Sequence, residues 1–172
     1  MRKLRYQVAT SLDGYLAAPG GAFDWIPMDP DIDFAALISQ FDTAVMGRKT
    51  FLAGMAHGGL PLADLKVVVY SRTLQAVDYP SVTLINGDPV EHMRSLQAAP
   101  GKDIWLYGGG ELFRTFAGAG IVDTVEPAVV PVLLGDGIPM LAPPHIRMKL
   151  SLTGQRLYSK SGILLLSYDV LR

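Results

Sequence analysis

The chain has 172 residues, of which 49% are hydrophobic and 18% are charged, and it contains no cysteine. This composition supplies enough apolar material for a buried core and argues against long disorder. With 15 lysine and arginine residues against 16 acids, the net charge of −1 disfavours a broad nucleic-acid surface. The missing cysteines exclude disulfides, thiolate zinc sites, iron–sulfur clusters and cysteine nucleophiles.

The patterns of the sequence predict neither a membrane helix nor a signal peptide. No apolar run approaches the roughly 18 residues that a membrane helix needs, and the opening MRKLRYQVAT lacks the apolar h-region of a signal peptide. Residues 1–172 have the length of one domain, and no linker divides them. We therefore expect a single cytoplasmic domain that binds neither nucleic acid nor a membrane.

Segments with strand character alternate with helical segments through the first two thirds of the chain. Strands are expected at residues 4–9, 43–46, 66–70, 82–85 and 104–107. Helices are expected at residues 33–40, 89–98 and 111–117, the second with Asp88 as its N-cap. This alternation predicts an α/β fold whose largely parallel sheet is covered by helices on both faces.

The last quarter of the chain has a different pattern. Residues 122–134 are strand-like but contain Pro127 and Pro131, which predicts an edge or bulged strand, and residues 135–144 are expected to form a loop. Residues 150–158 and 163–171 are expected to pair as a hairpin through Lys160-Ser161-Gly162. Because residues 163–166 are apolar on both side-chain parities, that strand is either central in the sheet or covered by another subunit.

The strongest local motif is a strand that ends at Gly47 and is followed by Arg48, Lys49 and Thr50 at the start of a helix. The free N–H groups and the dipole of a helix N-terminus attract phosphate, and neighbouring cations strengthen that attraction. The motif therefore indicates a phosphate site, with an ordinary solvated helix start as the alternative.

Two further strand ends carry residues suited to a ligand. Gly108, Gly109 and Gly110 separate a buried strand from a helix, and Ser71-Arg72-Thr73 follows another strand. Taken singly, a tight turn explains the glycines as well as a ligand does, and a solvated loop is the better explanation of Ser71-Arg72-Thr73. Ligands of open α/β sheets, however, bind beyond the carboxyl ends of the strands. The three ends together suit an extended phosphorylated cofactor, and Arg48 with Arg72 could grip a 2′-phosphate, which favours NADPH over NADH.

Four stretches carry a resemblance to a known family. SLDGYLA (residues 11–17), MGRKTF (46–51), VVYSRT (68–73) and YGGGELF (107–113) occur in the order seen in dihydrofolate reductase-like proteins. They most resemble stand-alone relatives of the reductase domain of the bifunctional riboflavin-biosynthesis deaminase–reductase, and VVPVLLGDGIPML (129–141) also resembles that branch. The resemblance implies a dihydrofolate reductase-like fold, a mostly parallel sheet with flanking helices and an antiparallel C-terminal hairpin, and NADPH as the cofactor.

The resemblance also implies which residues surround the cofactor. The backbone of Ala9 would meet the nicotinamide amide, Gly47 to Thr50 the phosphates, and Ser71 to Thr73 the adenosine end. The pyrophosphate and nicotinamide would lie over the glycine segment, which comprises Gly108, Gly109, Gly110, Glu111 and Leu112. By analogy, the Gly108–Gly109 peptide bond is expected to be cis.

The substrate side is expected to be acidic. No lysine, arginine or histidine occurs between Arg5 and Arg48, whereas six aspartates do. The resemblance places the pocket along this segment: Ser11, Asp13 and Trp25 would line it, and Asp31 or Asp33 would hydrogen-bond a heterocycle and assist protonation. Two alternatives stay open. The aspartates cap a helix and face water, and Trp25 packs beneath its loop instead of stacking on a substrate.

The resemblance, together with these residues, implies an NADPH-dependent reductase of a pyrimidine-type substrate. The first choice is 5-amino-6-(5-phosphoribosylamino)uracil reduction in riboflavin biosynthesis. A ribose-phosphate substrate needs a cation that the acidic segment lacks, although Arg114, Arg147 or Lys149 could supply one. Dihydrofolate or pterin reduction and a non-catalytic NADPH-binding sensor are the alternatives. We further expect a homodimer through the apolar C-terminal strands. No metal site is expected, because the three histidines lie far apart without ligand spacing.

Overall fold

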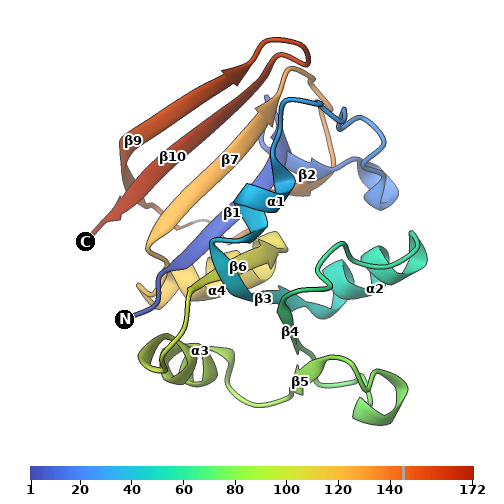
Figure 1. The fold of residues 1–172 in the computed structure, drawn as a ribbon, viewed down its shortest axis with the longest axis vertical. Coiled ribbons are helices and arrows are strands. Elements are labelled where there is room, and N and C mark those ends of the chain that lie inside the picture. Colours follow the sequence, from blue (N-terminus) through green and yellow to red (C-terminus); the bar gives the residue numbers. More distant parts are fainter. Residues whose placement is uncertain (145) are drawn as a thin grey trace.

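The computed structural model describes residues 1–144 and 146–172. Eight strands form one sheet in the order β5-β4-β3-β6-β1-β7-β10-β9. From β5 to β7 all neighbours are parallel, whereas β10 and β9 are antiparallel to their neighbours (Figure 1). The strands are β1 (Leu4–Ser11), β3 (Phe41–Gly47), β4 (Lys66–Tyr70), β5 (Thr83–Ile85), β6 (Asp103–Gly108), β7 (Thr124–Val130), β9 (Lys149–Tyr158) and β10 (Ile163–Leu171). The predicted α/β fold, mostly parallel and with an antiparallel C-terminal hairpin, is confirmed.

Helices and short connections fill the rest of the chain. The helices are α1 (Phe34–Ile38), α2 (Arg48–Ala56), α3 (Pro89–Ala98) and α4 (Gly110–Gly118), with short 3-10 turns at Pro19–Gly21 and Ala76–Asp78. A separate two-stranded sheet pairs β2 (Tyr15–Ala17) with β8 (Ile138–Pro139). The longest described helix has ten residues, whereas about 20 are needed to cross a bilayer. None of the helices in the described ranges is long and apolar enough for that.

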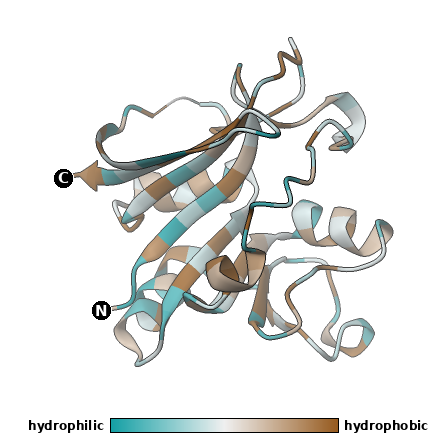
Figure 2. Cartoon of the chain, turned by 45° about the horizontal axis from the view of Figure 1, so that its top comes forward, coloured by the Kyte–Doolittle hydropathy of each residue, from teal (hydrophilic) through white to brown (hydrophobic). Residues whose placement is uncertain are grey.

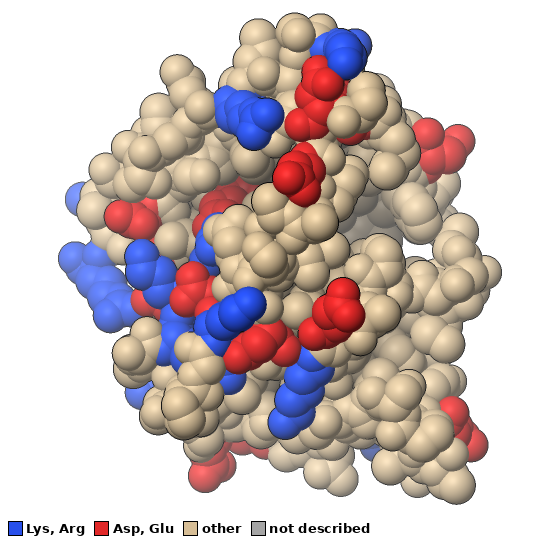
Figure 3. All heavy atoms as spheres, viewed as in Figure 1, with Lys and Arg blue, Asp and Glu red and all other residues tan. Residues whose placement is uncertain are grey.

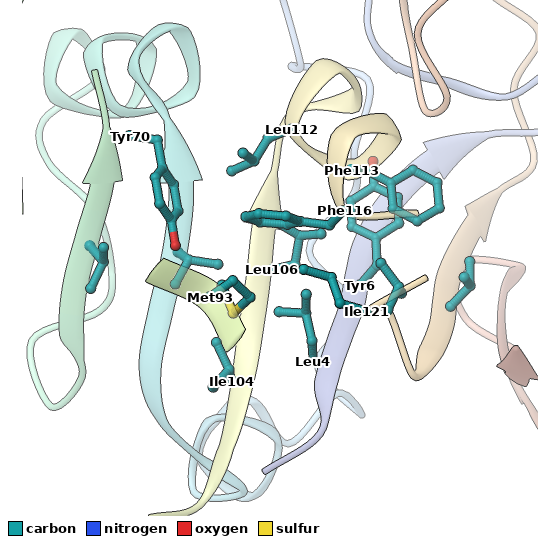
Figure 4. Packing of buried hydrophobic residues seen from close by; sticks show 14 residues of the cluster. Leu4, Tyr6, Tyr70, Met93, Ile104, Leu106, Leu112, Phe113, Phe116 and Ile121 are labelled. Atoms are coloured by element: carbon teal, nitrogen blue, oxygen red, sulfur yellow. The ribbon is translucent and has the colours of Figure 1, made fainter. Parts of the chain in front are cut away.

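The main core lies between the sheet and the pair α3 and α4. Tyr6 of β1 stacks on Phe113 of α4 with ring centroids 3.9 Å apart, and Phe116 and Met93 are fully buried beside them (Figure 4). These large side chains anchor α4 and fix the height at which its N-terminus stands above β6. Aromatic pairs of this kind add to the stability that apolar burial provides.

The opposite face of the sheet is covered by α2 and, more loosely, by α1. Phe51 of α2 is buried in a second core cluster that Leu37, Ile38 and Trp105 join. Every residue of α1 is apolar, and the helix stands in front of β1 and β6 as a short hydrophobic turn (Figures 1 and 2). None of its five residues is buried. Leu37 and Ile38 pack against the second cluster without being buried themselves.

Three expectations about secondary structure were wrong. The strand around Pro127 is not at an edge, because β7 lies between β1 and β10. The sheet accommodates the proline by a gap in the β7–β10 pairing. Val125 pairs with Tyr168 and Ala128 with Leu165, whereas the register skips Glu126 and Pro127 between them. The segment 135–144 is not all loop, since it contains β8. The first helix is shorter than predicted, starting after Asp33 and ending at Ile38.

The apolar strand at residues 163–166 is central. Strand β10 lies between β7 and β9, so the first of the two explanations that the sequence left open, a central position in the sheet, is confirmed. Cover by another subunit stays a prediction. Tyr158 and Ile163, at the tip of this hairpin, are buried with Val130 in a third cluster, which Trp25 and Ile32 join. The tip therefore packs against the segment that precedes α1.

Candidate functional site

The carboxyl ends of β3, β4 and β6 lie side by side at one edge of the sheet. Gly47 is in register with Tyr70, and Met46 with Gly108. The three motifs that follow these strands are consequently brought together, as the parallel topology predicts. Viewed as in Figure 1, the surface is hollowed between the part that carries the first 3-10 turn and α2 (Figure 3).

Strands β1 and β6 separate at the same edge. Their pairing runs from Leu4 and Ile104 to Tyr6 and Leu106 and stops there, although both strands continue. The backbone oxygen of Gln7 instead accepts a hydrogen bond of 2.8 Å from the indole Nε1 of Trp105. A split between adjacent parallel strands, with no ladder to close it, is where ligands of doubly covered sheets enter.

The two helices that begin at this edge lack side-chain caps. Gly47 is the N-cap of α2 and Gly109 that of α4, and neither helix start has a side-chain hydrogen bond. The other two helices are capped by carboxylates: Asp33 accepts from the first turn of α1, and Asp88 from the first turn of α3. The free N–H groups of α2 and α4 are therefore available, and their dipoles favour a negatively charged ligand.

Polar side chains surround these helix starts. The Arg48 guanidinium donates to Thr73 Oγ1 at 3.0 Å, which joins the α2 start to the turn after β4. The Oγ atom of buried Ser71 accepts from the N–H of Thr73 at 3.2 Å and so shapes that turn. Lys49 forms an exposed 3.0 Å ion pair with Glu111 of α4. The structure thus brings together all three predicted cofactor motifs, with Arg72 exposed next to them.

The glycines at the edge have different steric surroundings. A Cβ atom on Gly47 would meet nothing within 4 Å, so the space above this turn is open. A Cβ atom on Gly109 would lie 3.1 Å from Thr50 Oγ1, and one on Gly110 only 2.3 Å from the backbone oxygen of Pro139. Gly110 is therefore required by packing, whereas Gly47 is not. The Gly108–Gly109 peptide bond is cis, as the resemblance implied.

The two candidate proton donors have partners of their own. Asp31 forms a 2.8 Å ion pair with Lys160 at the turn of the β9–β10 hairpin. Asp33 accepts from the N–H of Ala36 at 2.9 Å and caps α1. Both side chains are exposed rather than set into the sheet. Either carboxylate would have to leave its present partner to reach a substrate beneath α1.

Ser11 and Asp13 fasten the loop after β1. Ser11 Oγ donates to Asp13 Oδ1 at 2.6 Å, and Asp13 accepts from the N–H groups of Leu134 and Gly135. These hydrogen bonds, led by that of Ser11, hold the pKa of Asp13 below its usual range. Trp25 is half-buried in the cluster at the hairpin tip, and its Nε1 donates to the Ala22 oxygen at 3.2 Å.

Comparison with known proteins places the chain in a family. Residues 2–164 match the family of the RibD C-terminal domain. The chain belongs to the RibD C-terminal domain family. YyaP of Bacillus subtilis, an uncharacterized protein, is 33% identical over 97% of this chain and 94% of its own length. The riboflavin biosynthesis protein RibD of Mycobacterium tuberculosis is 30% identical over 76% of this chain, which matches only 42% of that protein.

Solved structures agree with this fold. A crystal structure from Shewanella sp. PV-4 superposes with a TM-score of 0.85 at 25% identity and covers both chains completely. Dihydrofolate reductase from Enterococcus faecalis, complexed with NADP(H), superposes with a TM-score of 0.68 at 18% identity over 98% of this chain and 94% of its own. This member of the RibD C-terminal domain family therefore has a dihydrofolate reductase-like fold.

The sheet beneath α1 holds buried polar residues that the sequence analysis missed. Arg5 of β1 binds Glu126 of β7 through two hydrogen bonds of 2.8 Å, and Thr124 donates to the same carboxylate at 2.6 Å. Burial opposes the charge of Arg5, but Glu126 outweighs it and raises the pKa of Arg5. Gln7 is the register partner of Glu126 on β1. Alternation of polar and apolar side chains in residues 4–9 was the signal available, and it was used only to predict a strand.

The cations considered for a substrate phosphate lie elsewhere. Arg147 lines a cavity of about 510 Å³ on the α4 face of the sheet, together with Phe113 and Leu150. Arg114 of α4 donates to the Pro143 oxygen, and Lys149 starts β9. None of these three cations contacts the α1 side of the sheet in the part of the chain that the structure describes.

The histidines form no metal site within the described residues. His92 Nδ1 hydrogen-bonds the Tyr70 hydroxyl at 2.9 Å, and His57 Nδ1 lies 2.8 Å from the Ala53 oxygen. His145 lies outside the described residues. The described histidines therefore have local partners, each within its own neighbourhood.

Proposed function

We propose that this member of the RibD C-terminal domain family is an NADPH-dependent reductase of a pyrimidine-type substrate. Its activity would resemble 5-amino-6-(5-phosphoribosylamino)uracil reduction in riboflavin biosynthesis. The observation that carries the proposal is the pair of helix N-termini at Gly47 and Gly109, which start without side-chain caps at one edge of the sheet. The family match and the NADP(H)-bound dihydrofolate reductase of similar fold support it.

The residues at this edge fit a dinucleotide phosphate. The open space above Gly47 admits a phosphate to the N–H groups of α2, and Thr50, Gly108 and Gly109 adjoin the same turn. Arg48 and Arg72 supply the cations for a 2′-phosphate beside the Ser71-Arg72-Thr73 turn. In this proposal Ala9, at the mouth of the β1–β6 split, and Leu112 of α4 flank the nicotinamide end.

NADPH, when bound, supplies a hydride, and the protein supplies binding and orientation. The split between β1 and β6 gives a flat ring access to the backbone beyond Tyr6. Helix α1 forms an apolar wall above it, and Trp105 with Tyr107 forms an aromatic wall beside it, their rings 5.1 Å apart. Such walls exclude water from a planar heterocycle and hold it by stacking.

A pterin or dihydrofolate is the second candidate substrate. The observation that favours it is the charge on the substrate side. Lys160, next to the segment before α1, is already paired with Asp31, and Arg5 is paired with Glu126. A ribose phosphate there would find both of these cations engaged. A non-phosphorylated ring needs no such partner.

Turnover assays separate these substrates. NADPH oxidation should be followed with 5-amino-6-(5-phosphoribosylamino)uracil, with its dephosphorylated form and with dihydrofolate. Oxidation with either pyrimidine but not with dihydrofolate supports the first proposal. Oxidation with dihydrofolate alone supports the second, and tight NADPH binding without turnover of any of the three supports a nucleotide-binding sensor.

We also propose that the active form is a homodimer. Strand β9 is the edge of the sheet, and Leu152 and Leu157 on it are 52% and 64% exposed. An exposed apolar edge strand invites pairing with another chain.

A further inference from the structure

One buried polar side chain on β1 has no hydrogen-bond partner at its carbonyl end. Gln7 is only 8% exposed, and its Oε1 is the buried side-chain atom left unpaired among the residues that the structure describes. Buried polar atoms are nearly always paired, and leaving one without a partner lowers stability. The oxygen of Gln7 therefore calls for a partner that is not part of the folded chain.

Strand alternation fixes the direction of this side chain. Tyr6 and Val8 pack into the core on the α3 and α4 side, so Gln7 lies on the opposite face together with Arg5 and Ala9. That is the face over which α1 stands without burying any of its own residues. Gln7 is also the first residue of β1 beyond the pairing with β6, and the Trp105 indole holds its backbone oxygen. Its side chain therefore belongs to the floor of the β1–β6 split.

The neighbours of Gln7 leave its carboxamide free. Glu126, its register partner, is 5% exposed and is fully engaged by Arg5 and Thr124. The opposite charges of Arg5 and Glu126 offset each other, and Asp103, 3.5 Å from the far side of the Arg5 guanidinium, adds no cation, so no positive charge near Gln7 is left unpaired. A neutral ligand can therefore be buried there without the desolvation penalty of an unpaired ion.

We propose that Gln7 recognises the lactam edge of the substrate ring. A carboxamide offers an acceptor oxygen and N–H donors side by side, and it complements the adjacent N–H and C=O groups of a uracil or pterin ring. Gln7 and Ala9 are two residues apart on one strand, about 6.6 Å, so a substrate ring that lies against a nicotinamide at Ala9 reaches this carboxamide. The inference rests on the proposed function, because it assigns Gln7 to the substrate side of that same site.

The test combines stability with binding of a small probe. Gln7→Met removes the hydrogen-bonding groups and keeps the length of the side chain. We expect the variant to be at least as stable as the wild type in urea and to bind NADPH equally well. With NADP⁺ present, calorimetry should show that it binds 5,6-diaminouracil about tenfold more weakly, as expected when one buried ligand hydrogen bond is lost. Methylating both ring nitrogens of the probe should weaken binding to the wild type but not to the variant.

Gln97→Met is the matched control for a structural role. Gln97 is also buried, but its Nε2 donates to the Ile121 oxygen at 3.1 Å and to Asp123 at 3.2 Å. Its replacement should lower stability and leave probe affinity unchanged. A Gln7→Met variant that loses stability as Gln97→Met does, or that binds 5,6-diaminouracil as tightly as the wild type, overturns the inference. So does a wild type that binds NADPH but not the probe. If the wild type still oxidises NADPH with a substrate in any of these cases, the reductase proposal stands. A wild type that does not bind NADPH would overturn the reductase proposal as well.

Discussion

Two glycines at helix starts are as important to the proposed site as the polar side chains around them. Asp33 and Asp88 fill the helix starts of α1 and α3, while Gly47 and Gly109 leave those of α2 and α4 open. A carboxylate at either open start would compete with a phosphate for the same N–H groups. Glycine at these two positions therefore leaves the N–H groups free for the proposed phosphate.

Gly47→Ala tests this idea with the smallest possible change. The backbone of Gly47 is extended, with φ −83° and ψ 162°, and the added methyl group meets no protein atom. We expect the free energy of unfolding to change by less than about 1 kcal/mol, while the dissociation constant of NADPH, measured by fluorescence titration, rises at least about tenfold because the methyl group occupies the phosphate space. Gly118→Ala, at the other end of α4 and equally unobstructed, is the control and should change neither quantity.

Arg48→Ala should separate the two nicotinamide cofactors. The Arg48 side chain is exposed and held by Thr73, so its loss removes little packing. A charge-assisted hydrogen bond to a 2′-phosphate contributes about 1.5–3 kcal/mol, which corresponds to a rise of about ten- to a hundredfold in the dissociation constant of NADPH. NADH has no 2′-phosphate and should bind the variant nearly as it binds the wild type. Equal losses for both nucleotides would contradict the role given to Arg48.

The ion pair of Arg5 and Glu126 contributes to stability at the scale of single residues. Removing one partner of a buried pair leaves an uncompensated charge and costs about 3–5 kcal/mol. We therefore expect Glu126→Ala to lower the free energy of unfolding by about 3 kcal/mol in urea denaturation, since Arg5 keeps some solvent contact. The double variant Arg5→Met, Glu126→Leu should lose much less. A double variant as unstable as the sum of its single changes would show that the pair is not coupled.

At the scale of elements, the segment before α1 is tied to the tip of the β9–β10 hairpin. Asp29 is 3% exposed and accepts from the N–H groups of Asp31 and Ser161, both at 2.9 Å. Lys160 pairs with Asp31 next to it, and Trp25 packs against Tyr158 and its neighbours. These contacts hold the wall of the proposed substrate site against the C-terminal hairpin, which lies far away in the sequence.

Acid should loosen this tie. Hydrogen bonding from Ser161, and then from the backbone of Asp31, holds the pKa of Asp29 below its ordinary value. A carboxyl group with a lowered pKa in the folded state stabilises the fold above its unfolded pKa of about 3.9. That contribution disappears as the pH falls through the lower folded-state pKa. We expect Asp29→Asn to be less stable than the wild type in urea at pH 7 and to lose less stability on acidification. Parallel stability curves for the two proteins would contradict this.

The parts of the site that lie within one motif could be predicted, and the parts that depend on strand order could not. Residues 47–50 form one continuous motif and the glycines 108–110 another, and each follows a recognisable strand. The parallel topology alone therefore brings the two motifs together. Gln7 and Glu126 meet only because β7 inserts beside β1. The prediction that Pro127 marks an edge strand was wrong, because β7 still pairs with β10 on both sides of the proline. Only the β10 partners of Glu126 and Pro127 are missing. The partners of Asp31 and Asp33 could not be predicted, because nothing in the neighbouring sequence reveals Lys160 or the exact start of α1.

At the scale of the whole molecule, the sheet is covered unevenly. Helices α3 and α4 pack on β1 and β6 and their neighbours, but the same face of β9 and β10 extends beyond α4. Its apolar side chains are at least partly exposed, and Leu150 also lines the cavity beside Phe113. By strand alternation and register, this face comprises Leu150, Leu152, Leu157, Leu164 and Leu166. Apolar residues gathered at a sheet edge are the feature that the proposed homodimer would bury.

A charge on this face should therefore separate the subunits. Leu152→Asp places a carboxylate in the middle of the apolar face, where burial against a second copy would leave it without a partner. We expect light scattering after size-exclusion chromatography to give the mass of a dimer for the wild type and of a monomer for the variant. Val77→Asp, an equally polar change at an exposed apolar residue next to the opposite edge strand β5, is the control and should stay dimeric. A monomeric wild type would refute the dimer. A Leu152→Asp variant that remains dimeric would move the interface to another surface, because a buried, unpaired carboxylate is too costly for a stable interface to tolerate.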